Sequence, residues 1–578
     1  MRKSLNILLA TTIMASPAVA AAQDAAQFAI ELTPAAVDNE GAVRNVHVAL
    51  TIDAVEADAG DALLHLPVMA STVSTAADRL TGLSASDASG PIMLTAHDDI
   101  RDDANVERRW STDRAVSGTV QVSYDVPIDP HRPLIARPAY ELRTQDSTFS
   151  GAGNAFLLLP EDDRQRIVDV DWQLDAIGAD ARGASSFGVG DLTTQEPYAT
   201  GDLHRAYFMG GKPGLHQSAD GRFFSVWQGE FGFPAEELMN WTDRLQQYYG
   251  DFFGYKPPVF GVFGRTNTLN PGSGIGLTHS FAFTFSKDLS QQDLRGLLAH
   301  EMLHAWVNSL DGSMDQAGGL AKSWFGEGLA VHYQRLLPYH AGLISAEDFL
   351  DDLNSTAGRY YTNALIDTPN SEVPAGFWLD TRIRTLPYDR GSLYFAKLDA
   401  QIRAKTQGQY SLDYIVRNML AARRDGEPMD MALWKAWLFE MLGQQELDDF
   451  DAMLNGAVQV PPSDAFGRCF TRVTKKLQRF DLGFEPALLA SEDRVIEGLD
   501  PASNAAAAGL RNGDKVLNSF PTDSLQGDQE AMVTLKLRRG EKELDVTYLP
   551  RGEWVDAYQW EQVPYCNDTG ARSVAPSQ

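Results

Sequence analysis

The sequence predicts a chain of three domains: an N-terminal antiparallel β-sandwich, a central α+β domain and a small β domain near the C-terminus. Its 578 residues are too many for one hydrophobic core. Short apolar runs between loops rich in Asp, Gly, Ser and Pro fill the first third, which is typical of antiparallel strands. Runs with helical apolar spacing follow, up to about residue 454. The predicted domain boundaries are 23–188, 189–456 and 457–567.

The first domain shows its clearest strand patterns at 46–53, 118–124 and 166–174. These runs alternate apolar with polar residues and are rich in β-branched side chains, as half-buried strands are. The second domain opens with mixed signals. Its predicted elements are strands at 205–209, 222–228 and 259–263 and a helix at 234–253.

The two ends of the chain differ from the domains between them. Arg2 and Lys3 precede an apolar run at 5–15 and then a cluster of small residues, which is the pattern of a secretory signal peptide covering 1–22. We therefore expect an exported protein, periplasmic or secreted, with a signal of bacterial form. Residues 568–578 are small and polar, and we predict a disordered tail there.

The composition argues against two classes of partner. With 78 acidic and 49 basic side chains, the formal net charge is -29. Such a surface disfavours binding to nucleic acid and to anionic membrane surfaces. After the signal peptide, the sequence has no apolar run of about 18 residues, so we predict no membrane-spanning helix. The oligomeric state stays open.

Two cysteines, Cys469 and Cys566, bracket the last domain. In an exported protein two thiols can form a disulfide, so a bridge that closes this domain is the first interpretation. Two free thiols are the second. Neither cysteine has a Cys or His neighbour at ligand spacing, which argues against a metal site at this position.

A metal site is predicted in the second domain, where His300, Glu301 and His304 form the pattern His-Glu-x-x-His. On a helix the two histidines lie one turn apart on the same face, so both imidazoles can bind one metal ion. Glu301 lies on the neighbouring stripe, where it can reach a water molecule beside the metal. Ser290 and Asp293 have the spacing of a capping box, and helical apolar spacing continues until an Asp-Gly pair ends it.

A second predicted helix supplies the third ligand. Catalytic zinc sites have three protein ligands and an open position, and Glu327 is the first candidate because the segment after His304 is long enough for a turn and a new helix. His332 is the competing candidate, but it lies more than one turn past Glu327 and so points elsewhere. Further on, Tyr388 follows a proline at the start of a helix, where a phenol can donate a hydrogen bond to a developing oxyanion.

A glycine-rich stretch at 272–285 passes into an apolar strand just before the metal motif. Such a strand can lie along a cleft and pair with an extended peptide through its backbone groups. A plain core strand explains the same pattern equally well. Both interpretations stand at this point.

Taken together, these motifs resemble the gluzincins, the thermolysin-like zinc peptidases, and the closer similarity is to the glycyl aminopeptidase family. The resemblance rests on the motif at 300–304, Trp-Phe-x-Glu-Gly at 324–328, the glycine-rich strand that runs into His279, and Tyr-Asp-Arg-Gly at 388–391. It implies a β domain, a thermolysin-like α+β catalytic domain and a C-terminal PDZ domain, in the order found here.

By this resemblance one Zn2+ ion is held by His300, His304 and Glu327, and Glu301 is the general base and then the general acid. Tyr388 is similar to the tyrosine that stabilises the oxyanion. The implied activity is zinc-dependent hydrolysis of peptide bonds. The enzyme would be an aminopeptidase that favours small N-terminal residues such as Gly and Ala.

One position departs from the family's pattern. The family's substrate strand reads Gly-Gly-Leu-Glu-His, and its Glu is suited to bind the α-ammonium group of a substrate. Here the stretch at 275–279 reads Ile-Gly-Leu-Thr-His. The resemblance makes Gly276, Thr278 and His279 substrate-binding residues, but the neutral Thr278 forms no ion pair with a cation. Two alternatives therefore stand beside the aminopeptidase: a zinc peptidase without a free-amine requirement, and a non-catalytic peptide-binding protein.

The last domain resembles a PDZ domain through Leu-Gly-Phe at 482–484 and Ala-Gly-Leu-x-x-Gly-Asp at 508–514. This resemblance implies a C-terminal peptide as a partner besides the peptide substrates. Backbone N–H groups near 482–484 would bind its carboxylate. Packing of this domain on the catalytic domain is the equal alternative.

Overall fold

The computed structural model describes five stretches of the chain, residues 26–70, 73–102, 105–136, 139–311 and 318–566. The predicted signal peptide at 1–22 and the predicted disordered tail at 568–578 lie outside these described residues. Among the described helices, none combines the length and the apolar character needed to cross a bilayer.

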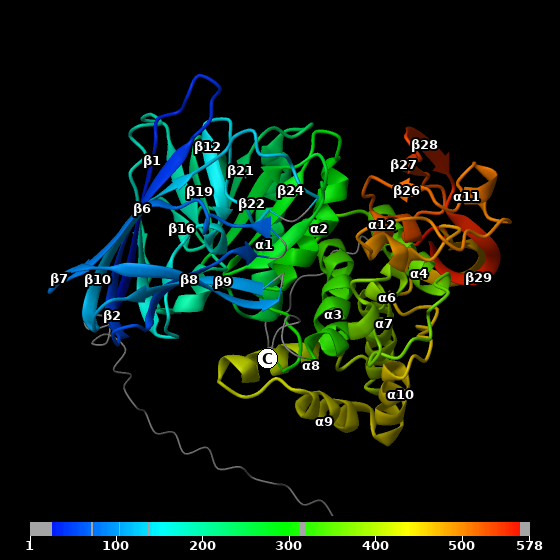
Figure 1. Cartoon of the computed structure of the whole chain (residues 1–578). Coiled ribbons are helices and arrows are strands. Elements are labelled where there is room, and N and C mark those ends of the chain that lie inside the picture. Colours follow the sequence, from blue (N-terminus) through cyan, green and yellow to red (C-terminus); the bar gives the residue numbers. More distant parts are fainter. Residues whose placement is uncertain (1–25, 71–72, 103–104, 137–138, 312–317, 567–578) are drawn as a thin grey trace, which may run out of the picture. The chain divides into compact units, whose positions relative to one another are not determined.

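The chain divides into two compact units, whose helices and strands are labelled in Figure 1. Unit 1 contains the chain as far as Arg132 together with Ala139–Gly214. Unit 2 contains Pro133–Pro138 and the chain from Leu215 onward. The predicted metal motif lies in unit 2.

Unit 1 is built of β-strands around one hydrophobic core. Strand β1 and the first eight residues of β2 bury every second side chain, as the period-two pattern of their sequences requires. In chain order the strands are β1 (Gln27–Pro34), β2 (Asn45–Ala57), β3 (Ala62–Pro67), β4 (Met69–Ala70), β5 (Val73–Ser74), β6 (Thr81–Asp87), β7 (Gly90–Ile92), β8 (Leu94–Asp102), β9 (Asn105–Thr112), β10 (Val116–Pro127), β11 (Arg143–Gln145), β12 (Thr148–Ala152), β13 (Leu159–Pro160), β14 (Gln165–Trp172), β15 (Arg182–Ser185), β16 (Gly188–Val189), β17 (Leu192–Thr193), β18 (Tyr198–Ala199) and β19 (Tyr207–Gly211).

The largest sheet of unit 1 has the strand order β17-β14-β1-β2-β10-β6-β7. The strands predicted at 46–53, 118–124 and 166–174 are β2, β10 and β14, which confirms a β-rich N-terminal part. Neighbours in this order are antiparallel except that β1 pairs with β14 in parallel. This corrects the expectation of a purely antiparallel sandwich. The long stretch of chain between β1 and β14 allows the chain to return and run in the same direction.

Unit 2 begins with a mixed sheet of strand order β20-β21-β22-β24-β23. The strands β21, β22 and β24 are parallel neighbours, and β23 runs antiparallel to β24 at the end of the order. The parallel strands are buried almost throughout, as expected where both faces of a sheet are covered. The five strands are β20 (Gly214–Gln217), β21 (Phe223–Gln228), β22 (Phe260–Thr266), β23 (Gly274–Leu277) and β24 (Ser280–Phe285).

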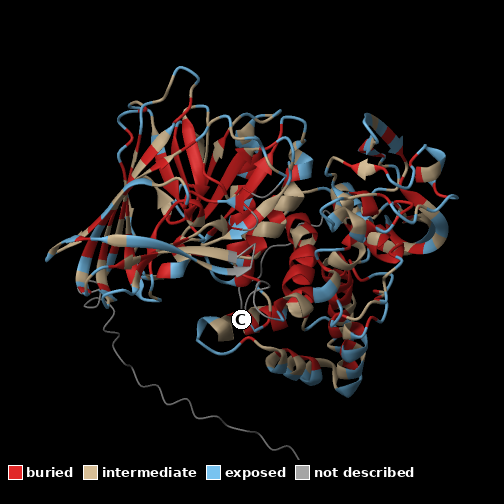
Figure 2. Ribbon diagram, viewed as in Figure 1, coloured by how far each residue is buried: buried red, intermediate tan, exposed pale blue. Residues whose placement is uncertain are grey.

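Helices make up the middle of unit 2. The helix predicted at 234–253 is α1, and α10 ends at Leu454, where the predicted helical pattern stops. Helix α3 is buried along most of its length and lies inside the core (Figure 2). The helices are α1 (Ala235–Phe253), α2 (Gln291–Leu303), α3 (Gly319–His340), α4 (Ala346–Tyr361), α5 (Val373–Gly376), α6 (Thr381–Arg384), α7 (Leu386–Lys405), α8 (Leu412–Arg424), α9 (Met431–Leu442) and α10 (Gln444–Leu454).

The C-terminal part of unit 2 has a hydrophobic core of its own, to which Leu482 and Leu535 belong. Its longest strands, β25 and β29, form an antiparallel ribbon. Phe470 and Trp560 of this ribbon pack in a different core, against Phe349 of α4, so the ribbon joins the C-terminal part to the helices. The elements are β25 (Phe470–Phe480), α11 (Asn504–Ala507), β26 (Lys515–Val516), α12 (Thr522–Gly527), β27 (Val533–Arg539), β28 (Lys542–Tyr548) and β29 (Arg551–Gln562).

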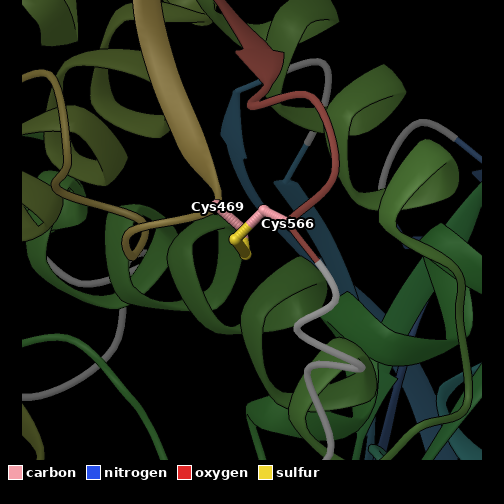
Figure 3. Close-up of a disulfide and its surroundings, with 2 residues drawn as sticks. All are labelled: Cys469 and Cys566. Carbon is pink, nitrogen blue, oxygen red and sulfur yellow. A yellow bond between two sulfur atoms is a disulfide. The ribbon is translucent and has the colours of Figure 1, made fainter.

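A disulfide joins Cys469 to Cys566 (Figure 3). Their Cα atoms lie 5.4 Å apart. The first cysteine precedes β25 and the second follows β29, so the bridge closes the end of the ribbon and encloses the C-terminal part of unit 2. Of the two interpretations of the cysteines, the bridged one is therefore confirmed.

Removing this bridge should destabilise the C-terminal part of unit 2. The bridge spans a sequence separation of 97 residues, and chain entropy predicts that a loop of this length is worth about 4–5 kcal/mol. We expect Cys469→Ser to lower the urea concentration at which proteolysis begins within residues 470–562. Cys566→Ser should have the same effect, and the double variant no larger one. Equal resistance of wild type and variants would contradict the prediction.

Candidate metal centre

His300, His304 and Glu327 come together although they lie on different helices. The Nε2 atom of His300 is 3.1 Å from Oε2 of Glu327, and the Nε2 atom of His304 is 3.5 Å from the same oxygen. One potential ligand atom from each residue lies within 4.8 Å of the others. The three side chains are largely buried, with 14%, 25% and 10% of their surfaces exposed. The structure thus brings all the predicted metal ligands to one place.

Helix α2 carries His300 in its last turn, and His304 is the residue that caps the end of the helix. Ser290 and Asp293 form the predicted capping box. The helix ends at Leu303, several residues before the predicted Asp-Gly stop. Hydrogen bonds between residues three positions apart form the turn that follows. In this turn the side chain of His304 bonds to the carbonyl oxygen of Val307, 3.1 Å away. This bond uses the carbonyl group to which residue 311 would donate if the helix continued, and the N–H group of Asp311 donates to Met429 instead.

Glycine residues set the position of Glu327 and Tyr388. Helix α3 crosses α7 so closely that a Cβ atom on Gly328 would lie 2.6 Å from Cα of Gly391. A Cβ atom on Gly391 would lie 2.4 Å from the carbonyl oxygen of Trp324. Glycine in a helix costs about 1 kcal/mol relative to alanine, and here it permits an approach that side chains would block. Glu327 and Tyr388 each lie within three residues of this crossing.

A chain of hydrogen bonds fixes which ring nitrogen of His300 donates to Gln334. Gln334 Nε2 donates to the Asp352 carboxylate at 2.8 Å, which turns the Gln334 amide oxygen toward His300 Nδ1, 2.9 Å away. Because a carboxylate only accepts hydrogen bonds, this orientation of the amide is the one that satisfies both contacts. The Nδ1 atom of His300 therefore carries a proton, and Nε2 is the ring nitrogen that faces Glu327.

In its neutral form, His304 has the Nδ1–H tautomer for the same reason. Its Nδ1 atom bonds to a backbone carbonyl oxygen, that of Val307, which can only accept. The Nε2 atoms of both imidazoles therefore point at the Glu327 carboxylate. A cation stabilises this arrangement, whether it is a proton or a metal ion. Outer partners of this kind orient the histidine ligands in metal sites. The donor set fits a divalent transition metal such as those that imidazole and carboxylate ligands hold.

The charges at the cluster lead to the same conclusion. Burial lowers the pKa of His304, but Glu327 outweighs this effect and the pKa rises to about 9. Burial raises the pKa of Glu327, yet His304 and His300 hold it well below the ordinary range of a carboxylate. The cluster thus keeps a carboxylate ionised and gathers positive charge around it. A bound cation satisfies the same requirement.

Glu301 lies between the metal cluster and the edge strand β23. A Cβ atom placed on Gly274 would lie 3.2 Å from Oε1 of Glu301. Gly276 is two residues further along β23 and so lies on the same face of the strand. A Cβ atom on Gly276 would meet nothing within 4 Å. The strand thus presents an open stretch of backbone beside the Glu301 carboxylate.

The other two predicted substrate residues form the turn between β23 and β24. Leu277 pairs with Ser280, so Thr278 and His279 are the two residues of the hairpin loop. His279 is exposed and has a φ of 47°, in the left-handed region. Of the two loop residues only the second, His279, has a positive φ, which is the pattern of a type II turn, and glycine or asparagine is more usual at that position. Both residues lie on the hairpin beyond the strand that passes Glu301.

Tyr388 stands in the first turn of α7, and its ring stacks on that of His300 with centroids 6.1 Å apart. Burial raises the pKa of Tyr388 well above its ordinary value, and the carboxylates of Glu327 and Glu301 raise it further. The phenol therefore stays protonated and can donate a hydrogen bond at this cluster. The predicted position of Tyr388 at the start of a helix is confirmed.

His332, the competing ligand, lies elsewhere. It is 3% exposed, contacts the ring of Tyr333, and lines a cavity of about 1670 Å³ together with Phe252 and Arg417. Burial lowers its pKa to about 3. His332 is a neutral core residue and not part of the cluster.

Sequence reasoning missed Gln334, Asp352 and the carbonyl group of Val307. One signal was present for the first: Gln334 lies seven residues after Glu327, which places both on the same face of α3. Asp352 lies on α4, and nothing near it in the sequence indicates its contact with Gln334. A bidentate ion pair between Arg359 and Asp389, next to Tyr388, also went unpredicted.

Residues 293–369 match the family model described as the M61 glycyl aminopeptidase. The chain is a peptidase. The match contains the whole His-Glu-x-x-His motif and Glu327, so the resemblance to glycyl aminopeptidases is confirmed for this part of the peptidase. Among curated proteins, no sequence matches that of the peptidase.

The fold of the peptidase is similar to that of an aminopeptidase N family protein from Idiomarina loihiensis. The TM-score is 0.63 at 16% identity, over 93% of this chain and 98% of that one. An M1 zinc metallopeptidase from Deinococcus radiodurans matches with a TM-score of 0.43 at 14% identity, over 76% of this chain and 96% of that one. Leukotriene A4 hydrolase from Saccharomyces cerevisiae matches with a TM-score of 0.43 at 11% identity, over 76% and 68%. The first likeness confirms a multidomain architecture with a β-rich N-terminal part and a helical part after it.

Proposed function

We propose that this peptidase hydrolyses peptide bonds with one zinc ion, as an aminopeptidase that favours small N-terminal residues such as Gly and Ala. The observation that carries the proposal is the convergence of His300 Nε2, His304 Nε2 and Glu327 within 4.8 Å, with Glu301 and Tyr388 beside them. The match of residues 293–369 to the glycyl aminopeptidases supports the substrate class.

The three ligand residues would hold the zinc ion. When bound, a zinc ion supplies a Lewis acid that makes water more acidic and polarises a scissile carbonyl group. In this proposal Glu301 takes a proton from the attacking water and delivers it to the nitrogen of the leaving amine. Tyr388 donates a hydrogen bond to the carbonyl oxygen as negative charge develops there. A binding protein has no need of such a base and donor, so the catalytic role is favoured over the non-catalytic alternative.

The edge strand β23 is the proposed binding site for the backbone of the substrate. In the described sheet β23 pairs only with β24, which leaves one side of the strand for an extended peptide. Gly274 and Gly276 carry no side chains that would hold a substrate away from Glu301. A peptide paired along this strand would place a backbone carbonyl next to the metal cluster.

The requirement for a free amine is tested by a pair of substrates. We expect the zinc-loaded protein to hydrolyse glycyl and alanyl arylamides faster than their N-acetylated counterparts. The neutral Thr278 leaves this preference weak, so Thr278→Glu should increase it about tenfold, since a hydrogen bond to a charged partner is worth about 1.5–3 kcal/mol. Steady-state rates on both substrate pairs provide the measurement.

Thr278→Gln serves as the control, because it has a similar size and no charge. Equal rates on free and blocked substrates, in wild type and in Thr278→Glu alike, would rule out the aminopeptidase. They would leave a zinc peptidase without a free-amine requirement as the function.

We propose that the C-terminal part of unit 2 is a PDZ domain that binds the carboxylate end of a peptide. Leu482 and Phe484 are buried in its core, and Gly483 has a φ of 80°. The N–H group of Gly483 already donates to Asp481 at 2.7 Å, so a ligand carboxylate would have to use the neighbouring N–H groups. Isothermal titration with peptides that end in a free or an amidated C-terminus tests the proposal.

We also propose that the protein is exported, to the periplasm or the medium. The sequence of residues 1–22 motivates this proposal, and the disulfide between Cys469 and Cys566 supports it, because disulfides persist in oxidising compartments. Cell fractionation combined with N-terminal sequencing of the mature chain tests it.

A further inference from the structure

The short helix α12 belongs to the C-terminal part of unit 2 but also contacts the catalytic helices. Leu525 lies in the core of the C-terminal part, and the Arg551 guanidinium donates to the carbonyl oxygens of Leu525 and Asp528. These contacts hold one side of α12. The other side carries Asp523, which faces α6.

Asp523 joins α12 to α6 through a set of hydrogen bonds. Arg384 donates to the Asp523 carboxylate from Nε at 3.0 Å and from Nη2 at 2.6 Å. The hydroxyl group of Thr381 donates to the same carboxylate, and Gln526 Nε2 donates to that hydroxyl oxygen at 2.7 Å. We call Thr381, Arg384, Asp523 and Gln526 the α6–α12 joint.

The α6 residues of the joint, Thr381 and Arg384, lie just before Tyr388 in the chain. Helix α6 ends at Arg384, Thr385 is shared by the end of α6 and the start of α7, and Tyr388 follows in the first turn of α7. The next residue, Asp389, is fully buried and forms a bidentate pair with Arg359 at 2.5 and 2.8 Å. Arg359 Nη1 also lies 3.5 Å from the backbone carbonyl oxygen of Asp523. Contacts to α12 and α4 therefore hold the backbone on both sides of Tyr388.

We propose that Asp523 is a positioning residue for the reaction, which fixes Arg384 and thereby the start of α7, so that the Tyr388 hydroxyl group stays aimed at the metal cluster. This inference rests on the proposed function and deepens it. The C-terminal part of unit 2 then contributes to catalysis without touching the substrate. A donor to an oxyanion is effective only when its position is held, because a misplacement of about 1 Å can cost about a hundredfold in rate.

A second ion pair at the same boundary provides a matched control. Arg382 of α6 donates to Glu485 at 2.7 Å and also to Asp380. Glu485 is 80% exposed, whereas the Asp523 side chain is 43% exposed. Glu485→Gln thus removes the negative charge of an ion pair between α6 and the C-terminal part, while the α6–α12 joint and the Arg382–Asp380 pair remain. Comparing the two variants distinguishes an ion pair that only attaches the C-terminal part to α6 from one that positions Tyr388.

The test compares Asp523→Asn with Glu485→Gln in the full chain loaded with zinc. We expect Asp523→Asn to lower kcat about tenfold on an alanyl arylamide, with KM within about twofold of wild type. Arg384→Gln breaks the joint from the other side and should lower kcat by the same factor. Glu485→Gln should keep the kcat of wild type. Zinc content and melting temperature, measured for each variant, identify any loss that comes from unfolding.

The decisive measurement is a double-mutant cycle with Tyr388→Phe. If Asp523 acts through the phenol hydroxyl group, then Asp523→Asn should change kcat less than about twofold in the Tyr388→Phe background. If the fold losses in kcat of the two single variants multiply in the double variant, the inference is wrong. The inference is also wrong if Asp523→Asn changes only KM, which would mean that Arg384 contacts the substrate. An equal loss of kcat in Glu485→Gln would contradict it as well.

Failure of the proposed function has a separate signature. If wild type shows no hydrolysis, or if Glu301→Gln is as active as wild type, the proposed function fails and the inference fails with it. If wild type is active, Glu301→Gln is inactive and Asp523→Asn equals wild type, only the inference fails.

Discussion

Replacing Glu301 with glutamine should abolish peptide hydrolysis and leave zinc binding intact. Glutamine has the shape of glutamate but cannot take a proton, and general base catalysis contributes about 10²–10⁴-fold to rate. Glu301 is not one of the clustered ligands His300, His304 and Glu327. We therefore expect kcat on an alanyl arylamide to fall by at least about a hundredfold, with KM little changed. Metal analysis of the same preparation should give wild-type zinc content.

The control for this prediction is Glu347→Gln, which makes the same chemical change in the first turn of α4 at an exposed residue. It should keep wild-type activity. Full activity of Glu301→Gln with zinc bound would refute the assignment of Glu301 as the base. Loss of zinc from this variant would instead make Glu301 a ligand.

Glu327→Gln should lose the metal and the activity together. The substitution removes the negative charge that faces two imidazole nitrogens at 3.1 and 3.5 Å. Changing an outer partner of a ligand already costs about 10–100-fold in metal affinity, so loss of a ligand itself should cost more than about a hundredfold. Competition with a chromophoric chelator measures the affinity. Activity should return only when zinc is added well above the concentration that saturates wild type.

His332→Gln provides the comparison, because His332 was the competing ligand and lies outside the cluster. It should bind zinc as wild type does, and its melting temperature reports on the buried site. If instead His332→Gln loses zinc and Glu327→Gln retains it, the ligand assignment is wrong.

The metal ligands could be predicted because their signals are local. His300 and His304 are one helical turn apart, so any helix through them presents both imidazoles on one face. The prediction of Glu327 as a ligand required only that the next helix pack beside the first, which is common because consecutive elements are usually neighbours in space. The position of Tyr388 at a helix start is also local, since a proline at the preceding residue suits the first turn.

Other parts of the site could not be predicted from local pattern. Gln334 and Asp352 fix the tautomer of His300 through two hydrogen bonds, yet neither belongs to a motif. Asp523 contacts Arg384 only because α12 folds onto α6. The parallel pairing of β1 with β14 likewise depends on where the chain returns and not on the pattern of either strand.

The sequence by itself determined the helical face that carries His300, Glu301 and His304, the presence of a β-rich part before it, and the motifs that match the glycyl aminopeptidases. Periodicity and capping act within a few residues, and the sequence records them directly. Only the tertiary structure decided how closely α3 approaches α7 at Gly328 and Gly391, which tautomer each histidine adopts, and which part of the chain holds Tyr388. These features depend on distances between segments remote in the sequence, and packing sets such distances.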